Sequence, residues 1–227
     1  MDALVEGLME ELNCETVFTI PLFGGIPVYE SVVVTWIIMA AVFLLCILLS
    51  RNLSVENPSR RQVVVETAIK GLNDFFTETV GEKGKAYIPY LSAIAIYIGI
   101  ANLIGLLGFK PPTKDMNVTA TLALMSIVLI EVAGIRARGT KGWLKSFAEP
   151  MPIILPINIL EVFIKPLSLC MRLFGNVLGS FVIMELLKVV PAVLPAVFSC
   201  YFDIFDGLIQ AYVFVFLTGL FIKEATE

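Results

Sequence analysis

The 227-residue chain contains no histidine, and only 16% of its residues are charged. Because histidine is the commonest metal ligand and a usual proton shuttle in proteins, any proton relay in this chain has to use carboxylates, amides or water. The formal net charge of −4 is small, and the basic residues lie in short segments rather than in one patch. We therefore expect no nucleic-acid partner.

Cysteine is also sparse, and its spacing excludes two classes of site. The four cysteines are far apart in the sequence and three of them fall within apolar runs: Cys14, Cys46, Cys170 and Cys200. Neither a zinc site nor a disulfide framework has such a spacing. We interpret these residues as small hydrophobic side chains.

Further absences bear on targeting and on chemistry. Residues 1–15 carry five acidic residues but no Lys or Arg, which is the opposite of a secretory signal or a transit peptide, so we expect the first apolar segment to be retained. The chain also lacks a phosphate-binding Gly-Lys-Ser/Thr loop and a nucleophile elbow. We expect a non-enzymatic chain that neither binds nor hydrolyses ATP and that holds no cofactor or metal.

Hydrophobic residues are abundant in the chain. Hydrophobic residues make up 58% of the sequence and the mean hydropathy is +0.88, values that no ordinary soluble domain reaches. The pattern predicts an all-α integral membrane protein in a single membrane domain, with five transmembrane helices and one amphipathic surface helix. The expected segments are an outer N-terminal stretch at 1–30, spans at 31–50, 87–109 and 117–135, a surface helix at 58–80, and a C-terminal hairpin with arms at 153–190 and 192–222.

The boundaries follow from length and from helix-breaking residues. Each span has about the 20 apolar residues that a helix needs to cross the hydrocarbon core. Pro111 and Pro112 stop the second span, and Gly139 and Gly142 interrupt helical order after the third. The hairpin turn is expected at 190–195. Each arm would be about 45 Å long, so the hairpin has to tilt strongly or kink. The candidate bend or close-contact positions are Pro166, Gly175, Gly179 and Gly207.

The distribution of Lys and Arg predicts the orientation. With the N-terminus outside, the outer loops hold only Lys110 and Lys114. The inner segments then hold Arg51, Arg60, Arg61, Lys70, Lys83, Lys85, Arg136, Arg138, Lys141, Lys145 and Lys223. Because positive residues favour the cytoplasmic side, we expect the C-terminus inside the cell.

Two polar faces interrupt the hydrophobic hairpin. At about 100° per residue, one stripe within about 40° of Arg172 contains Glu161, Lys165, Ser168, Arg172, Asn176 and Gly179. On the second arm, Asp203, Asp206 and Gln210 follow at spacings of three and four and share a face. Polar faces at this depth indicate water between the arms or a protein partner beside them.

Arg172 is the most informative residue of the stripe. An arginine near the bilayer centre costs at least about 2.5–3.5 kcal/mol and marks an ion pathway or a paired counter-charge. Its guanidinium does not release its proton, so it can act only as a fixed charge. A carboxylate arriving within about 4 Å would be favoured in its ionised form by roughly 4 kcal/mol at an effective dielectric constant of about 20. Such a group would have to release its proton or metal ion on arrival.

Three other roles for Arg172 stay open at this point. It could pair within the chain with Glu161, Asp203 or Asp206 to hold the hairpin together. It could bind an anionic substrate in a secondary transporter, although the inverted repeats of such proteins are not visible. The chain could also be a structural membrane anchor. Loss of coupled ion transport with retained assembly in an Arg172→Ala variant would favour the ion pathway over the anchor.

One family carries the same residues in the same order. The run 165–176 reads Lys-Pro-Leu-Ser-Leu-Cys-Met-Arg-Leu-Phe-Gly-Asn, and the run 210–218 reads Gln-Ala-Tyr-Val-Phe-Val-Phe-Leu-Thr. In these motifs and in its overall layout the chain resembles subunit a of the bacterial F-type ATP synthases. The resemblance implies a stator subunit of the membrane sector, whose long tilted hairpin lies against the c-ring and whose two offset half-channels couple the flow of H⁺ or Na⁺ to rotation.

The resemblance also implies residue roles, partners and a location. Arg172 matches the essential arginine that faces the c-ring carboxylates, Gln210 the polar residue beside it, and Asn176 and Ser168 polar positions nearby. Glu161 matches an acidic position of the cytoplasmic access route, and Asp203 the titratable position of the outer half-channel, with Asp206 close to it. The implied partners are the c-ring, subunit b in the peripheral stalk, the rest of the synthase and membrane lipid, in the bacterial plasma membrane.

The chain departs from the family pattern at one position. Many relatives carry Glu or His nine residues after the arginine, whereas this chain has Phe181, with Glu185 one turn further on. Glu185 is a candidate replacement, although it lies about 140° from Arg172 around the helix. Two alternatives stay open: Glu185 and Lys188 as interfacial residues, and Glu161 paired with Lys165 as mutual neutralisation.

Overall fold

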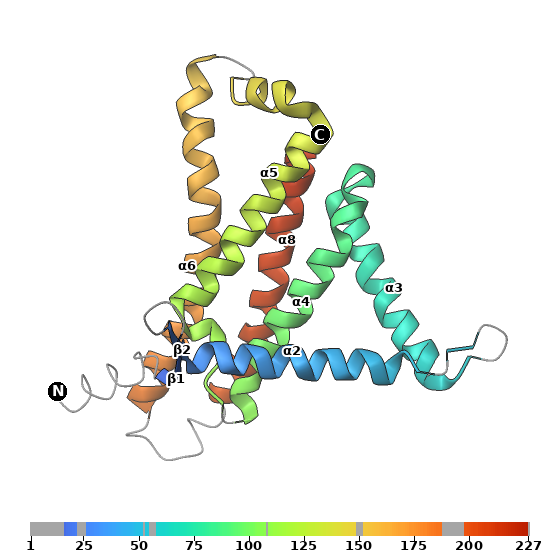
Figure 1. The fold of residues 1–227 in the computed structure, drawn as a ribbon, viewed down its shortest axis with the longest axis vertical. Helices are drawn as coiled ribbons and strands as arrows, with labels where there is room; N and C mark the ends of the chain where they lie inside the picture. Colours follow the sequence, from blue (N-terminus) through green and yellow to red (C-terminus); the bar gives the residue numbers. More distant parts are fainter. Residues whose placement is uncertain are drawn as a thin grey trace.

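The computed structural model describes residues 16–21, 26–51, 53–54, 58–107, 109–148, 152–187 and 198–226. Within these residues, five helical segments are long and apolar enough to cross a membrane: Glu30–Leu49, Glu82–Leu106, Met116–Ser146, Leu155–Met184 and Phe198–Thr226. Their arrangement is a helical bundle with one helix running out to the side (Figure 1). The predicted class, an all-α membrane protein, is confirmed.

The N-terminal stretch contains a feature that the sequence analysis did not predict. Strands β1 (Thr16–Ile20) and β2 (Ile26–Tyr29) pair antiparallel, with Ile20 opposite Ile26. The segment Thr-Val-Phe-Thr-Ile is rich in β-branched residues, which favour strands. Because β2 ends where the first long helix begins, the hairpin lies at one end of that helix (Figure 1).

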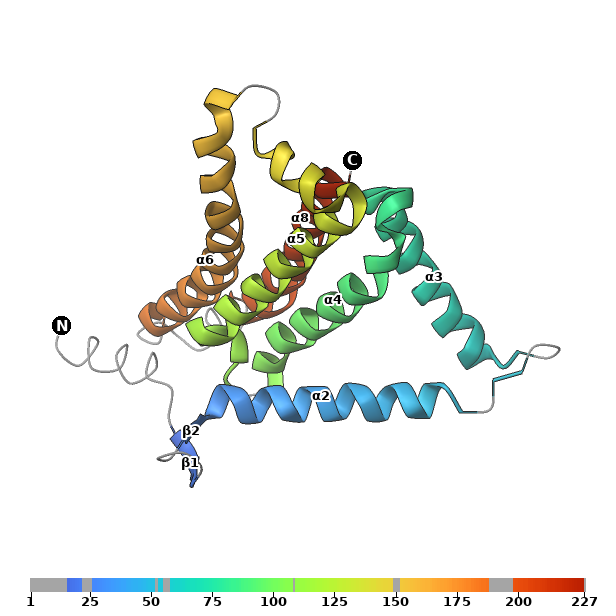
Figure 2. The ribbon, with the colours of Figure 1, turned by 45° about the horizontal axis from the view of Figure 1, so that its top comes forward.

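Helix α2 (Glu30–Leu49) packs on α4 through residues from Val34 to Val42. Val34 and Ile38 are buried against Ala101 and Ile104, whereas apolar side chains from Phe43 onward are largely exposed. The helix runs crosswise to α6 and α8 in two views (Figures 1 and 2). If these helices share one bilayer, they cannot all stand perpendicular to it, which is in keeping with a strongly tilted hairpin.

Helix α3 (Arg60–Val80) packs into the bundle through its last turns. Ser59 caps its start by accepting a hydrogen bond from the Gln62 amide at 3.3 Å. Phe76 and Val80, in the last turns, are fully buried in the core, while Val63 near the start is exposed. Its position along a membrane surface remains a prediction.

The two middle spans are α4 (Ile88–Leu103) and α5 (Met116–Ser146), with short 3₁₀ turns η1 (Glu82–Tyr87), η2 (Ile104–Leu107) and η3 (Pro112–Lys114) around them. Asp115 fixes the start of α5, because its carboxylate accepts from the Asn117 amide at 2.9 Å and from the Ser31 hydroxyl at 2.6 Å. This buried contact joins the beginnings of α2 and α5.

The first helical part of α5 runs a few residues past the predicted end at 135, through Arg136 and Arg138, because Arg is a good helix former. The predicted break at Gly139 is present, and a second helical part then runs to Ser146. Gly139 alone leaves helical geometry, with φ of 73°, and bends the chain there. Gly142 stays within the helical segment, so only one of the two predicted interruptions is observed.

The hairpin arms are α6 (Leu155–Leu187), preceded by η4 (Pro152–Ile154), and α8 (Gly207–Thr226). At 1.5 Å per residue α6 is about 50 Å long, well beyond the hydrocarbon thickness of about 30 Å. A π-helical segment η5 (Tyr201–Asp206) precedes α8. The predicted turn at 190–195 lies outside the described residues.

The main hydrophobic core lies where α4, α5 and α8 meet, and α6 packs against α5. Ile98, Ile127 and Phe214 are buried in this core, as are Leu169 and Leu173 of α6. The arms α6 and α8 come close at the end near β1 and β2 and diverge toward the C-terminus in both ribbon views (Figures 1 and 2). Direct contact between the arms is therefore confined to a few side chains.

Candidate functional site

The polar stripe of α6 runs beside the face that packs on α5. Leu169 and Leu173 turn toward α5 and are at most 1% exposed. Arg172 lies next to this buried face and its side chain is exposed, as is that of Ser168. Within the described part of the chain, Arg172 forms no hydrogen bond or ion pair. None of its three predicted intrachain partners, Glu161, Asp203 and Asp206, is bonded to it.

One turn beyond Arg172, a hydrogen bond joins the two arms. The Asn176 amide donates from Nδ2 to Gln210 Oε1 at 2.8 Å. Gln210 is only 4% exposed, and its Nε2 has no hydrogen-bond partner among the residues that the structure describes. Because an unpaired buried donor costs about 1–3 kcal/mol, this amide group is ready to bind a further acceptor.

A cavity of about 350 Å³ opens beside this hydrogen bond. Its polar lining comes from α6, from residues 199–210 of the second arm, from the end of α4, and from Lys110. The predicted site residues Asn176, Asp203, Asp206 and Gln210 all line it. The other lining residues are Asn102, Gly105, Phe109, Lys110, Pro111, Val177, Ser180, Met184, Ser199, Phe202 and Gly207. The volume has room for several water molecules, at about 30 Å³ of liquid each.

Asp203 is held against the end of α4. The Ser199 hydroxyl donates to Asp203 Oδ2 at 2.8 Å, one turn away along the chain. The carboxylate lies over Gly105, where a Cβ would be 3.1 Å from Asp203 Oδ1. A larger residue at 105 would push the carboxylate out of this position.

The close approach of α4 to α8 depends on Asn102 and Gly207. Asn102 donates to the Gly207 carbonyl oxygen at 3.0 Å and accepts from the Thr113 hydroxyl at 2.9 Å. A Cβ on Gly207 would lie 2.9 Å from that of Asn102, closer than real Cβ contacts allow. Asn102 therefore links two helices and also lines the cavity.

Glu131 makes its hydrogen bond within α5. Its carboxylate accepts from Trp143 Nε1 at 2.8 Å, so both partners belong to α5. The bend at Gly139 brings the last turns of α5 back toward Glu131 and makes this contact possible.

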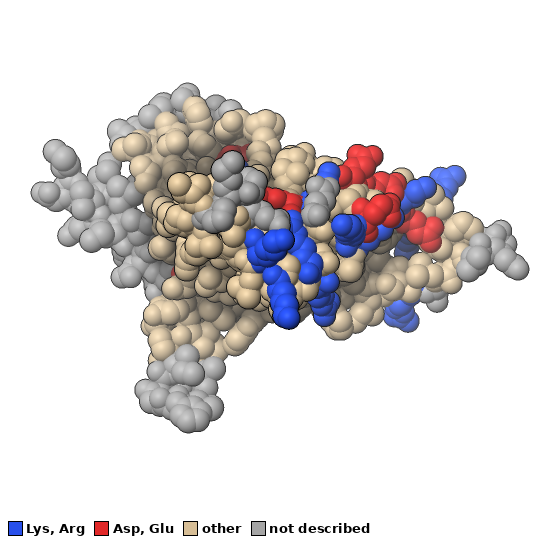
Figure 3. Space-filling view, turned by 90° about the horizontal axis from the view of Figure 1, so that it is seen from above, with Lys and Arg blue, Asp and Glu red and all other residues tan. Residues whose placement is uncertain are grey.

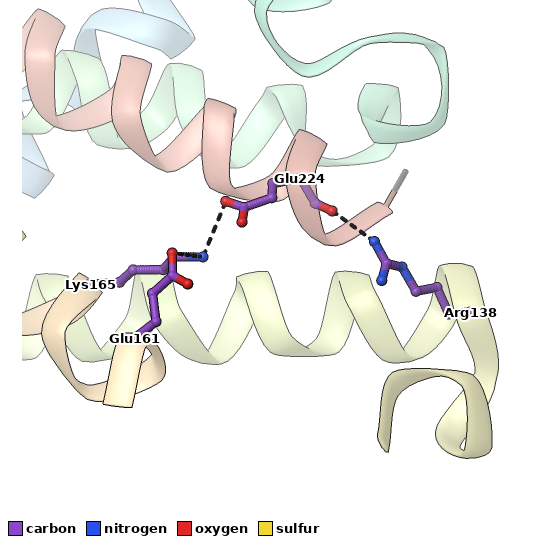
Figure 4. A network of polar contacts seen from close by, with 4 residues as sticks. All are labelled: Arg138, Glu161, Lys165 and Glu224. Carbon is purple, nitrogen blue, oxygen red and sulfur yellow. Dashed lines mark hydrogen bonds and ion pairs between the residues drawn. The ribbon is translucent and has the colours of Figure 1, made fainter. Parts of the chain in front are cut away.

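Glu161 lies far from the cavity, at the other end of the stripe. Its Oε1 is 3.2 Å from Lys165 Nζ, and the same ammonium is 3.2 Å from Glu224 Oε2 of α8 (Figure 4). Sequence reasoning missed Glu224, because no pattern along one helix indicates which residue of another helix meets its stripe. The Arg138 guanidinium also donates to the Glu224 carbonyl oxygen at 3.0 Å.

The sequence also suggested Glu185 as a replacement for the acidic or histidine residue that many relatives carry at the position of Phe181. Glu185 and Phe181 belong to the helical run of α6, but their side chains lie outside the described residues, as does Lys188. Ser180 and Ser199 are polar lining residues that the sequence analysis did not single out. Serine is frequent on helix surfaces, so neither residue carried a signal by itself.

Comparison with known proteins assigns the chain to a family. The family model for the ATP synthase A chain matches residues 32–223. ATP synthase subunit a of Moorella thermoacetica is 36% identical, over 88% of this chain and 92% of the relative. ATP synthase subunit a, sodium ion specific, of Propionigenium modestum is 34% identical, over 88% of this chain and 74% of the relative. This chain therefore belongs to the ATP synthase A chain family.

Proposed function

We propose that two half-channels in this chain meet near Arg172 and carry a cation across the membrane, so that ion flow drives a carboxylate-bearing rotor. Membership of the family makes the chain a non-catalytic, ion-translocating subunit of the membrane sector of an ATP synthase. The observation that carries the residue assignment is an exposed Arg172, unpaired among the described residues, one turn from the Asn176–Gln210 hydrogen bond that borders a cavity with two carboxylates.

The cavity is the proposed outer half-channel. Asp203 and Asp206 supply negative charge, and Ser180 and Ser199 supply hydroxyl oxygens along the wall. Such groups lower the cost of a cation or of a chain of water molecules at membrane depth. Gln210 lies at the inner end, where its unpaired Nε2 can donate to water or to an arriving rotor carboxylate. Glu185 remains a candidate for the same half-channel.

Arg172 is the proposed barrier between the two half-channels. A rotor carboxylate that arrived with a bound ion would lose it, because attraction by the guanidinium within about 4 Å is worth roughly 4 kcal/mol at an effective dielectric constant of about 20. The exposure of Arg172 and its lack of a partner in the described chain support this role, since a guanidinium paired within the chain could not act on a passing group. Each charge that crosses supplies about 2.3 kcal/mol per 100 mV.

An exposed apolar face of α6 beside Arg172 is the surface that we propose contacts the c-ring. Apolar side chains of α6 that are 47–69% exposed follow one another at helical spacing: Leu160, Phe163, Ile164, Leu167 and Met171. Ser168 and Arg172 lie next to them and are exposed as well. A lipid-facing stripe would not carry an arginine, whereas a rotor that brings its own carboxylates would pair with it. Subunit b is the other proposed protein partner, and lipid covers the remaining apolar surface.

Charge on one end of the molecule supports the orientation with the C-terminus in the cytoplasm of a bacterial cell. Lys and Arg gather over the end of α5, and a mixed group of charges lies over α3 (Figure 3). The exposed basic residues at the end of α5 are Arg136, Arg138, Lys141 and Lys145. By the positive-inside rule this end faces the cytoplasm, and ions leave there past Glu161.

The test is an Arg172→Ala variant in the assembled synthase. In inverted membrane vesicles we expect ATP-driven ion transport and ATP synthesis to fall by about a hundredfold or more, as for removal of one group that stabilises charge in a site. The complex should still co-purify with its other subunits. Arg136→Ala, at an exposed arginine of α5, is the matched control and should transport normally. Intact synthesis in Arg172→Ala would refute the proposed mechanism.

The identity of the ion needs its own measurement. The Propionigenium modestum relative is named as sodium ion specific, and the cavity oxygens suit Na⁺ as well as hydrated H⁺. ATP hydrolysis by the purified complex should be measured at fixed pH while Na⁺ is added. Activation by Na⁺ would indicate sodium coupling, and indifference to Na⁺ would indicate proton coupling.

A further inference from the structure

The end of α8 is held by cations from three neighbouring elements. Arg138 of α5 donates to the Glu224 carbonyl oxygen at 3.0 Å, and Lys83 of η1 donates to the Thr226 carbonyl oxygen at 3.4 Å. Lys165 of α6 pairs with the Glu224 carboxylate at 3.2 Å. The last carbonyls of a helix lack intrahelical partners and carry partial negative charge, so these contacts are favourable. The end of α8 is thereby anchored to α5 and η1.

Lys165 belongs to α6 but makes more contacts with α8 than with its own helix. Its ammonium lies 3.2 Å from Glu224 Oε2 and 4.8 Å from the centroid of the Phe221 ring, and both partners are in α8. Glu161, at 3.2 Å, is its partner within α6. The Lys165 side chain is only 16% exposed, whereas Glu161 is 46% exposed. The ammonium is thus drawn between the two helices rather than out toward solvent.

Among the described residues, two polar contacts connect the arms: an outer link, Asn176 to Gln210, and an inner link, Lys165 to Glu224. The outer link uses short amides where the arms are close, and the inner link uses long side chains toward the end where they diverge (Figures 1 and 4). Between the links α6 advances about 16 Å and α8 about 21 Å, at 1.5 Å per residue. Arg172 lies between the two links.

We propose that Lys165 is a positioning residue for Arg172: by pairing with Glu224 it holds the inner half of α6 at a set angle to α8, so that the exposed guanidinium stays at the depth of the outer link. The inference rests on the proposed function, in which Arg172 acts on a passing carboxylate. Without the inner link α6 is held to α8 by the Asn176–Gln210 hydrogen bond and by its packing on α5. Arg172, two turns from Lys165, would then vary in position.

The simpler view is that Lys165 only neutralises Glu161. That pair lies within one helix at a spacing of four, where such pairs are worth about 0.2–0.5 kcal/mol, and it cannot set an angle between two helices. The two interpretations predict that different second substitutions restore transport after the charge of Lys165 is reversed. A reversed charge at 165 is compensated by a reversed Glu224 if the contact between helices matters, and by a reversed Glu161 if local neutralisation matters.

The experiment compares two charge swaps in the assembled synthase. Lys165→Glu should lower ATP-driven ion transport per ATP hydrolysed by about ten- to a hundredfold, because a misplacement of about 1 Å can cost a hundredfold. Adding Glu224→Lys should restore transport, and adding Glu161→Lys should not. Lys165→Arg should keep transport, and Arg136→Gln, at an exposed arginine of α5 outside the inner link, is the matched control.

Three outcomes decide the inference. Rescue by Glu224→Lys alone supports it, whereas rescue only by Glu161→Lys, or by neither, overturns it. If the reversals prevent assembly, the neutral variants Lys165→Met and Glu224→Gln replace them, and unchanged coupling in both overturns the inference. Arg172→Ala is measured beside them: if it retains transport, the proposed function fails, and if it abolishes transport while the swap does not rescue, only the positioning role fails.

Discussion

The two ends of the α6–α8 hairpin use carboxylates in opposite ways. At the outer end, Asp203 and Asp206 line a cavity, and the partner of Asp203 is the neutral Ser199 hydroxyl. At the inner end, Glu161 and Glu224 share the ammonium of Lys165. A carboxylate whose hydrogen-bond partner is a neutral hydroxyl can take up a cation, whereas one already paired with lysine has its charge compensated. Under the proposed function, ion binding belongs to the outer end and helix positioning to the inner end.

The largest effect is expected at the outer end. Asp203→Asn keeps the shape and the contact with Ser199 but removes the charge, so ATP-driven transport should fall by about a hundredfold, the lower range for loss of a proton-transfer group. Transport into inverted vesicles measures this. Asp74→Asn, on α3, is the control. Normal transport in Asp203→Asn would mean that the cavity is not the entry route.

A smaller effect, on stability, is expected where α4 meets α8. Gly207→Ala places a Cβ 2.9 Å from that of Asn102, and such overpacking costs about 1–3 kcal/mol. Thermal unfolding of the detergent-solubilised complex should therefore begin at a lower temperature. Gly175→Ala is the matched control, because among the described residues no atom beyond its own helical backbone and chain neighbours lies within 4 Å of its added Cβ. Equal unfolding temperatures for the two variants would contradict the tight α4–α8 contact.

The outer link should contribute less. Asn176→Ala removes the hydrogen bond to Gln210, and such bonds between helices in membranes are worth about 0.6 kcal/mol on average and at most about 1.7. A lower unfolding temperature, smaller than that of Gly207→Ala, is the expected result. Ser168→Ala, on the same stripe, should unfold as the unmodified protein does, because the Ser168 hydroxyl makes no hydrogen bond among the described residues. A loss as large as that of Gly207→Ala would show that the link holds the hairpin closed.

The smallest effect should follow Glu161→Gln at the inner end. The lost pair with Lys165 is worth about 0.2–0.5 kcal/mol, and Glu224 still holds the ammonium. Stability should be nearly unchanged, and transport should fall much less than in Asp203→Asn. If transport falls as far as in Asp203→Asn, Glu161 carries ions itself, and the contrast between the two ends no longer holds.

Much of the fold could be predicted from the sequence, because spans are encoded locally. Apolar length and breaks at Pro111 and Pro112 indicated the first four helical segments, and the helical period placed Arg172 and Asn176 on one stripe. Errors arose where neighbouring structure decides the outcome. The second helical part of α5, which runs to Ser146 after the break at Gly139, was not predicted, and the strands β1 and β2 were not foreseen.

The candidate site likewise combines features that the sequence predicts with features that only the tertiary structure decides. The residue types and their order along each helix follow from the sequence, since helical period alone places Asp203, Asp206 and Gln210 on one face. Which helix each face meets is decided only in three dimensions. Gly105 makes room for the Asp203 carboxylate, Asn102 reaches the Gly207 carbonyl, and Lys165 meets Glu224, all across wide gaps in sequence. Such pairings depend on crossing angles and depths of packing, which no periodicity within one helix records.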